Sequence, residues 1–190
     1  LKSAQIFSNL LKSAQICTNL LKSAQLCLNL LKSAQNNGWV LTSISLNPPI
    51  PERVVTGVRY LTLNLASFSE LQKLLCDQQY EFVVNLGGYI DHRLFNAGGR
   101  ELIETHFTGL QNLLEALPRN SLRRFVQIGS SDEYGDALAP QSESLREKPI
   151  SPYSLAKTAS TFFLQMLHLT ENFPAVTLRL FLTYGPRQDA

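Results

Sequence analysis

The stretch Ser151-Pro152-Tyr153-Ser154-Leu155-Ala156-Lys157 decides the fold, together with Gly129-Ser-Ser-Asp-Glu-Tyr-Gly135 just upstream. If Tyr153 opens a helix after the proline, Lys157 lies one turn further on and on the same face. An ammonium beside a phenol favours the phenolate and lowers the phenol's pKa from about 10 towards neutral pH. The spacing therefore predicts that Tyr153 is a general acid/base.

Ser130 follows an apolar run, Arg124-Phe-Val-Gln-Ile128, that is typical of a buried strand. Its hydroxyl is expected at the carboxyl end of that strand, where open α/β sheets bind ligands. Tyr-x-x-x-Lys alone is a weak signal, and its simplest interpretation is an exposed helix face. That interpretation loses weight because a strand ending in Ser-Ser, a Tyr-Gly turn, a proline-entered helix and Arg179-Leu-Phe-Leu-Thr-Tyr-Gly-Pro186 follow in one order.

With these motifs the chain resembles the extended short-chain dehydrogenase/reductase family, specifically its nucleotide-sugar epimerases, dehydratases and reductases. The resemblance covers residues 36–190 and is strong from Tyr80 onward. It implies an α/β fold with a partial Rossmann-like, doubly wound parallel sheet. It also implies a nucleotide-sugar substrate and a triad in which Ser130 binds the reacting oxygen, Tyr153 moves the proton and Lys157 holds the cofactor ribose.

Hydrophobic patterning predicts the elements that would carry this site. Strands are expected at Val40–Leu46, Val58–Leu63, Glu81–Gly88, Leu122–Ile128 and Ala175–Phe181, and helices at Phe68–Cys76, Glu101–Leu117 and Tyr153–Leu169.

An acidic residue, Asp132, is the further catalytic candidate. Family dehydratases carry an acidic pair at the two positions after the serine or threonine, which here are Ser131 and Asp132, with Glu133 one further on. One acid is displaced, which favours a 4-ketoreductase or epimerase over a 4,6-dehydratase. A solvated turn explains Asp132 and Glu133 nearly as well.

The resemblance also places the cofactor-binding residues at the ends of three expected strands. No acid stands at the end of the first, so NAD and NADP are both expected as cofactors, with NADP slightly favoured. Two glycines after the third strand fit either close approach to a ligand or a plain turn. Besides Tyr153 and Lys157, the candidates are Ser45, Asn64, Leu65, Leu86, Gly87 and Gly88.

Residues 1–35 form a tandem repeat in which Leu-Lys-Ser-Ala-Gln begins at Leu1, Leu11, Leu21 and Leu31. Its composition predicts a helix, but a ten-residue period does not keep the leucines on one stripe. Duplication of a short coding segment is the favoured explanation, and an interaction or self-association helix is the alternative. The expected organisation is thus a helical repeat at 1–35 followed by an incomplete NAD(P)-binding domain at 36–190.

The domain is expected to be incomplete because no glycine precedes Gly38, and the family's glycine-rich turn would stand before that residue. Family members have a first strand and a glycine-rich turn ahead of the first helix, where backbone amides meet the pyrophosphate. They also continue beyond the point where this chain stops. We therefore expect impaired activity. An enzyme completed by the repeat or a partner chain, and a non-enzymatic interaction module built on the repeat, stay open.

Composition excludes several other classes. The 17 basic and 15 acidic residues give no electrostatic reason for nucleic-acid binding. Cys17, Cys27 and Cys76 form no Cys-x-x-Cys pair, so no structural metal is expected. Neither a membrane segment nor a secretory signal is indicated, so a cytoplasmic location is expected by default. A homo-oligomer is neither indicated nor excluded.

Overall fold

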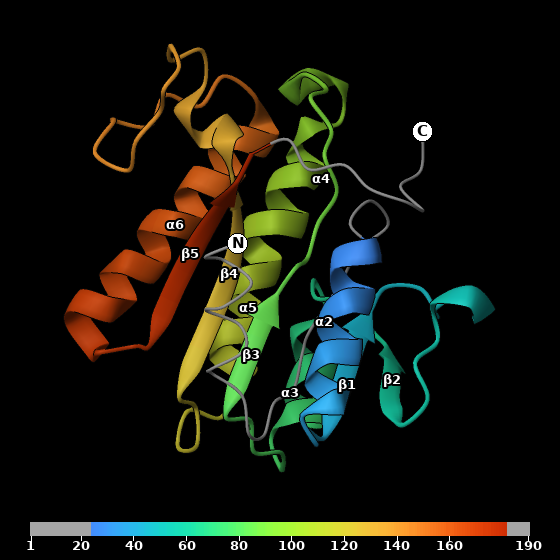
Figure 1. Ribbon diagram of the computed structural model, residues 1–190. Helices are drawn as coiled ribbons and strands as arrows, with labels where there is room; N and C mark the ends of the chain where they lie inside the picture. Colours follow the sequence, from blue (N-terminus) through green and yellow to red (C-terminus); the bar gives the residue numbers. More distant parts are fainter. Residues whose placement is uncertain (1–23, 182–190) are drawn as a thin grey trace.

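The computed structural model describes residues 24–181, which form five strands with helices on both sides (Figure 1). The order of the main elements follows the sequence predictions closely. They are α2 (Ala24–Asn36), β1 (Leu41–Ser45), β2 (Val58–Thr62), α3 (Phe68–Leu75), β3 (Phe82–Asn85), α4 (Gly99–Ile103), a π-helical turn (Glu104–Thr108), α5 (Gly109–Ala116), β4 (Arg124–Ser130), a 3-10 turn (Ser131–Tyr134), α6 (Pro152–Glu171) and β5 (Ala175–Leu180).

All five strands pair in parallel, in two sheets. β1 pairs with β2, and β3, β4 and β5 form a second sheet in that order. Across Figure 1 the strands run β5, β4, β3, β1, β2, so the chain winds outward in both directions from a point between β3 and β1. This confirms the Rossmann-like, doubly wound prediction. Ligands of such sheets bind at the carboxyl ends of the strands beside that switch point.

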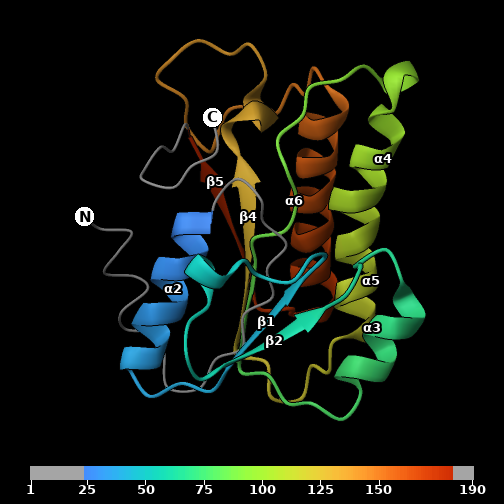
Figure 2. The same ribbon diagram turned by 90° about the vertical axis from the view of Figure 1, so that its right-hand side faces the viewer.

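Helices cover both faces of the sheets, as Figure 2 shows with α2 on one side and α3, α5 and α6 on the other. α2 buries Leu30, Leu31 and Ala34 against β1, and it ends at Asn36, two residues before Gly38, whose φ of 77° is left-handed. This glycine ends the helix as the sequence predicts. Residues 24–35 of the repeat are thus helical, and Leu30, Leu31 and Ala34 pack on the chain's own core, whereas residues 1–23 lie outside the described part.

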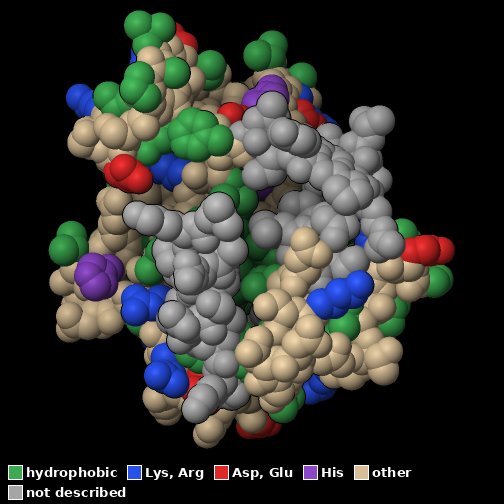
Figure 3. Space-filling view, viewed as in Figure 1, with side chains coloured by type: hydrophobic (Ala, Val, Ile, Leu, Met, Phe, Trp, Pro, Cys, Tyr) green, Lys and Arg blue, Asp and Glu red, His purple; other side chains and the backbone are tan. Residues whose placement is uncertain are grey.

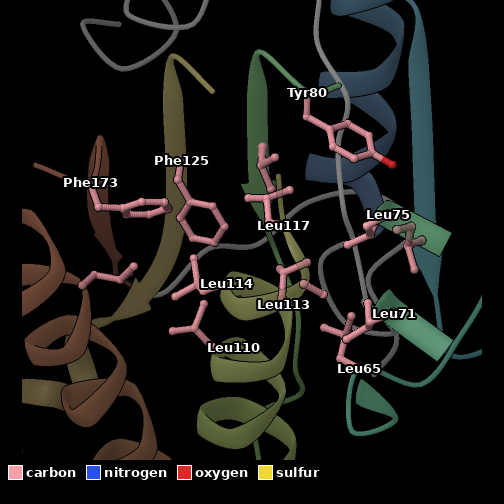
Figure 4. Close-up of a cluster of buried hydrophobic side chains, with 14 of the residues drawn as sticks. Leu65, Leu71, Leu75, Tyr80, Leu110, Leu113, Leu114, Leu117, Phe125 and Phe173 are labelled. Atoms are coloured by element: carbon pink, nitrogen blue, oxygen red, sulfur yellow. The ribbon is translucent and has the colours of Figure 1, made fainter. Parts of the chain in front are cut away.

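The larger core cluster lies between the sheets and the helices on the α3, α5 and α6 side (Figure 4). Leu110, Leu113 and Leu114 of α5 pack against Phe125 of β4, and Leu71 of α3 lies at the opposite side of the cluster. This core fixes β4 relative to α6. The two elements that carry the predicted triad are therefore held rigidly to each other.

Basic and acidic side chains are interspersed on the face drawn in Figure 3. Such mixing provides no strongly basic surface there for a polyanion. Across residues 24–181 no helix combines the length and apolar character needed to cross a membrane.

Candidate active site

Ser130 ends β4 and begins the 3-10 turn that follows. Its Oγ accepts the N–H of Asp132 at 3.2 Å, and its own N–H donates to Glu133 Oε1 at 3.0 Å. These reciprocal bonds form a capping box. The turn thus fixes the Ser130 hydroxyl at the carboxyl end of the strand, as the sequence predicts.

The amino terminus of α6 places Tyr153 and Lys157 together. Ser151 caps the helix by accepting the N–H of Ser154 at 3.1 Å, and Pro152 occupies the first turn. Both predicted residues are buried, and the Lys157 Nζ lies 5.8 Å from the centre of the Tyr153 ring. Lys157 Nζ also donates to Ile128 O of β4 at 3.0 Å. The predicted common face is confirmed.

The electrostatics of Tyr153 differ from the sequence expectation. Burial raises the pKa of Tyr153 to about 12; a hydrogen bond with Ser130 lowers it, and the charges of Asp132 and Glu133 raise it further. Burial also lowers the pKa of Lys157 to about 8, against the charge of Glu133. The predicted lowering of the Tyr153 pKa was wrong for this structure, because sequence spacing does not reveal desolvation.

His106 is a site residue that the sequence analysis did not select. It lies on the π-helical turn, its Nε2 is 3.0 Å from Tyr89 O, and its ring meets the Tyr153 ring edge-on at 5.1 Å. Burial lowers the pKa of His106 to about 3, and the charge of Lys157 acts in the same direction, so the ring is neutral at pH 7. Since Nε2 donates to a carbonyl, the buried Nδ1 is an acceptor, and no partner for it is seen among residues 24–181. A π turn is a frequent mark of function, but no sequence pattern predicts one here.

Asp132 and Glu133 face opposite ways. Asp132 is partly exposed and lies 3.6 Å from the Nε2 of His92, whose ring is 5.8 Å from that of Tyr153. Glu133 is fully buried and bonds to Arg179 instead. Of the two acids, Asp132 is the one that lies against His92, the ring next to Tyr153.

The candidate cofactor residues divide into two groups. Near β1 and β2, Ser45 Oγ donates to Asn47 O at 2.7 Å and Asn64 Oδ1 accepts the N–H of Ala66 at 2.9 Å, so both side chains bond to their own loops. Leu65 is buried, and its carbonyl accepts a bond from Asn112 at 3.0 Å.

The second group follows β3. Leu86 is buried, and Gly87 donates its N–H to Asn85 Oδ1 at 3.0 Å. Gly88 has a φ of 110°, and a Cβ there would lie 1.8 Å from the His106 ring. The missing side chain of Gly88 therefore makes room for His106.

Within residues 24–181 no group of three or more His, Cys, Asp or Glu side chains is arranged to hold a metal ion. Cys76 is exposed and free.

A model of the NAD dependent epimerase/dehydratase family matches residues 23–190. The chain belongs to this family. The match spans α2, all five strands and both elements that carry the predicted triad. It confirms the family that the sequence motifs indicate.

Curated relatives of this epimerase/dehydratase-family chain match about two thirds of its length. Protein CapI of Staphylococcus aureus is 29% identical over 126 residues, which are 65% of this chain and 38% of that protein. A dTDP-glucose 4,6-dehydratase of Streptomyces niveus is 29% identical over 145 residues, 66% of this chain and 42% of that enzyme. The chain thus spans about two fifths of the length of these curated relatives.

The fold also matches solved structures. UDP-glucuronic acid 4-epimerase from Bacillus cereus, solved in complex with NAD, has a TM-score of 0.76 and 25% sequence identity with the chain. The match covers 93% of this chain and 58% of that one. It confirms the Rossmann-like architecture.

Proposed function

We propose that this chain supplies the acid–base part of an NAD(P)-dependent enzyme that epimerises or reduces a nucleotide-linked sugar at a keto or hydroxyl carbon. The observation that carries the proposal is the convergence of Ser130 and Lys157 on Tyr153 from two elements, β4 and α6. A phenol between a hydroxyl donor and a buried ammonium is suited to exchange a proton with a sugar oxygen.

The residues fit the nicotinamide ribose of such a cofactor. Lys157 Nζ has three N–H groups, of which Ile128 O takes one. Lys157 would bind the ribose hydroxyls and Tyr153 would lie beside the reacting carbon. The bound cofactor would accept or return a hydride. Tyr153 would remove the proton from the sugar hydroxyl in one direction and return it in the other, while the Ser130 hydroxyl would turn from Tyr153 to donate its hydrogen bond to the same sugar oxygen.

The position of Glu133 supports epimerisation or 4-keto reduction over 4,6-dehydration. Elimination of water uses two acidic groups at the sugar in the family dehydratases. Here Glu133 is enclosed and paired with Arg179, so Asp132 alone is placed for such a role. The nucleotide-sugar substrate is proposed by analogy with the relatives named above.

We also propose that cofactor affinity is reduced and that NADPH is accepted as well as NADH. Gly38, the first glycine, follows α2, so no glycine-rich turn precedes that helix in this sequence. Two or three missing amide contacts of roughly 1.5–3 kcal/mol each would weaken binding by on the order of a thousandfold. Ser45, with no acid at this position, would not repel a 2′-phosphate.

Turnover at saturating cofactor tests the proposal. The chain is given NADPH or NADH with a 4-keto sugar nucleotide, and cofactor oxidation is followed by absorbance. We expect slow oxidation that falls about a hundredfold or more in Tyr153→Phe, because the proton donor is lost. Tyr60→Phe removes a phenol on β2, outside the triad, and is the matched control. Equal rates in wild type and Tyr153→Phe would contradict the proposal.

A further inference from the structure

A buried ion pair lies directly behind Ser130. The Glu133 side chain is fully enclosed, and its Oε2 accepts Arg179 Nε at 2.9 Å and the Thr161 hydroxyl at 2.8 Å. Its Oε1 accepts the N–H of Ser130 at 3.0 Å. One carboxylate thus joins the end of β4, the following turn, α6 and β5.

Arg179 is held on three sides. Besides Glu133 it donates to the Tyr134 hydroxyl at 2.9 Å and to Glu147 Oε1. Burial opposes its charge, but the bond to Tyr134 and the two carboxylates hold the pKa of Arg179 above its usual value. A Cβ at Gly129 would lie 2.5 Å from Glu133 Oε1, so β4 carries a glycine where the carboxylate needs room. The absence of a side chain at Gly129 thus leaves space for the Glu133 carboxylate of the ion pair.

The pair determines which way the Ser130 hydroxyl can donate. A hydroxyl has one O–H to donate and two lone pairs to accept. The capping box uses Ser130 Oγ as an acceptor for the Asp132 N–H, so its proton can be donated towards Tyr153, whose pKa Ser130 lowers. The box closes only while an acceptor at position 133 holds the Ser130 N–H. The chain of bonds runs from Arg179 through Glu133 to Ser130.

Stability alone is a weak reason for such a pair. Replacing a buried ion pair by apolar side chains of similar volume is often neutral or stabilising. We propose that Glu133 and Arg179 are positioning residues that orient the Ser130 hydroxyl towards Tyr153. This inference rests on the proposed function of the same site. Neither residue touches the reacting atoms, and both act through Ser130.

The Ser130 contribution can be measured at Tyr153 itself. A single difluorotyrosine at position 153 ionises at a lower pH than tyrosine and titrates by fluorine NMR without signals from the other tyrosines. Ser130→Ala should raise its pKa by about one unit or more, because a hydrogen bond to a charged group is worth roughly 1.5–3 kcal/mol.

Two double variants then isolate the positioning role. Glu133→Gln with Arg179→Met keeps an acceptor for the Ser130 N–H, whereas Glu133→Leu with Arg179→Met removes it, and the charges of the two variants are equal. Ser130→Ala should still raise the pKa of the residue at position 153 by about one unit or more in the Glu133→Gln double variant. In the Glu133→Leu double variant the same change should raise that pKa by less than about half a unit. An equal shift in both would overturn the inference, because a merely structural role changes stability and not the coupling.

Controls keep the result interpretable. Glu147→Gln weakens a different contact of Arg179 and does not touch Ser130, so it should retain the full shift. If the Glu133→Leu form does not fold by circular dichroism, Glu133→Met in the same background replaces it. The titration needs neither cofactor nor substrate. A failure of the proposed function would appear as absent turnover with the coupling intact, and a failure of this inference as absent coupling with turnover intact.

Discussion

Around Tyr153 the polar side chains bond across elements of the fold, whereas at the carboxyl ends of β1 and β2 they bond to their own loops. Lys157 reaches from α6 to Ile128 of β4. Ser45 and Asn64, by contrast, each bond to a residue two positions further along the chain. The side chains of the first region are thus held by tertiary structure, and those of Ser45 and Asn64 by local turns, although Asn112 of α5 holds the backbone of the loop after β2.

The two regions therefore differ in how firmly the fold holds their side chains before a ligand binds. A group held by several elements keeps one geometry when a ligand arrives, so its binding energy is not spent on ordering. We infer that the nicotinamide end of a cofactor meets a preorganised site and the adenosine end does not. Substitutions in both regions test that contrast, and they are taken in order of decreasing effect.

Gly88→Ala should be the most damaging single change. The residue has a φ of 110°, and its new Cβ would overlap the His106 ring. Strain and overpacking together should cost about 4 kcal/mol of unfolding free energy, measured by urea denaturation. Gly38→Ala is the matched control, since Gly38 also has a positive φ but no atom within 4 Å of its Cβ position. A similar cost at both glycines would show that His106 does not constrain the loop.

Lys157→Met should stabilise the fold while weakening cofactor binding. A pKa of about 8, below the ordinary value of 10.5, corresponds to about 3 kcal/mol at pH 7. The Ile128 carbonyl would lose its partner at a cost of about 1 kcal/mol, which leaves a net gain of about 2 kcal/mol.

The pH dependence checks the sign of this effect. Because the folded pKa of Lys157 is depressed, its stability contribution is present above pH 10.5 and is lost as pH falls through about 8. As pH rises from 8 to 10, the unfolding free energy of wild type should therefore increase relative to that of Lys157→Met. Parallel curves for the two proteins would mean that the lysine is hydrated rather than desolvated.

His106 should make the fold sensitive to mild acid. Its folded pKa of about 3 lies below the ordinary 6.5, so its contribution is present above pH 6.5 and is lost as pH falls towards 3. Between pH 8 and pH 5 this amounts to about 2 kcal/mol. Unfolding of wild type and His106→Asn by urea at both pH values measures it. The variant should lose about 2 kcal/mol less than wild type, and an equal loss in both would contradict a buried neutral ring.

Ser45→Asp addresses the weaker region and should have the smallest effect. A carboxylate at the end of β1 would repel a 2′-phosphate and favour a 2′-hydroxyl. The ratio of NADPH to NADH affinity, measured by fluorescence titration, should fall about tenfold. Asn47→Asp adds the same charge nearby and is the control. Equal changes for both cofactors in Ser45→Asp would place the adenosine elsewhere.

Much of this architecture could be predicted from sequence, because strand and helix patterns are local. The common face of Tyr153 and Lys157 follows from helix geometry alone. The pKa of Tyr153 could not be predicted, since it depends on how deeply tertiary packing buries the phenol. The inward turn of Glu133 and the π turn at His106 were missed for the same reason, as both depend on contacts with distant residues.

The most direct test of the contrast uses the two halves of the cofactor as separate ligands. Reduced nicotinamide mononucleotide and AMP are each titrated into the chain and into Lys157→Ala, with binding followed by calorimetry. The account predicts that the nicotinamide half binds more tightly than AMP and loses affinity about tenfold or more in Lys157→Ala, while AMP is unaffected. AMP binding as tight as that of the nicotinamide half, or nicotinamide binding that ignores Lys157, would contradict it.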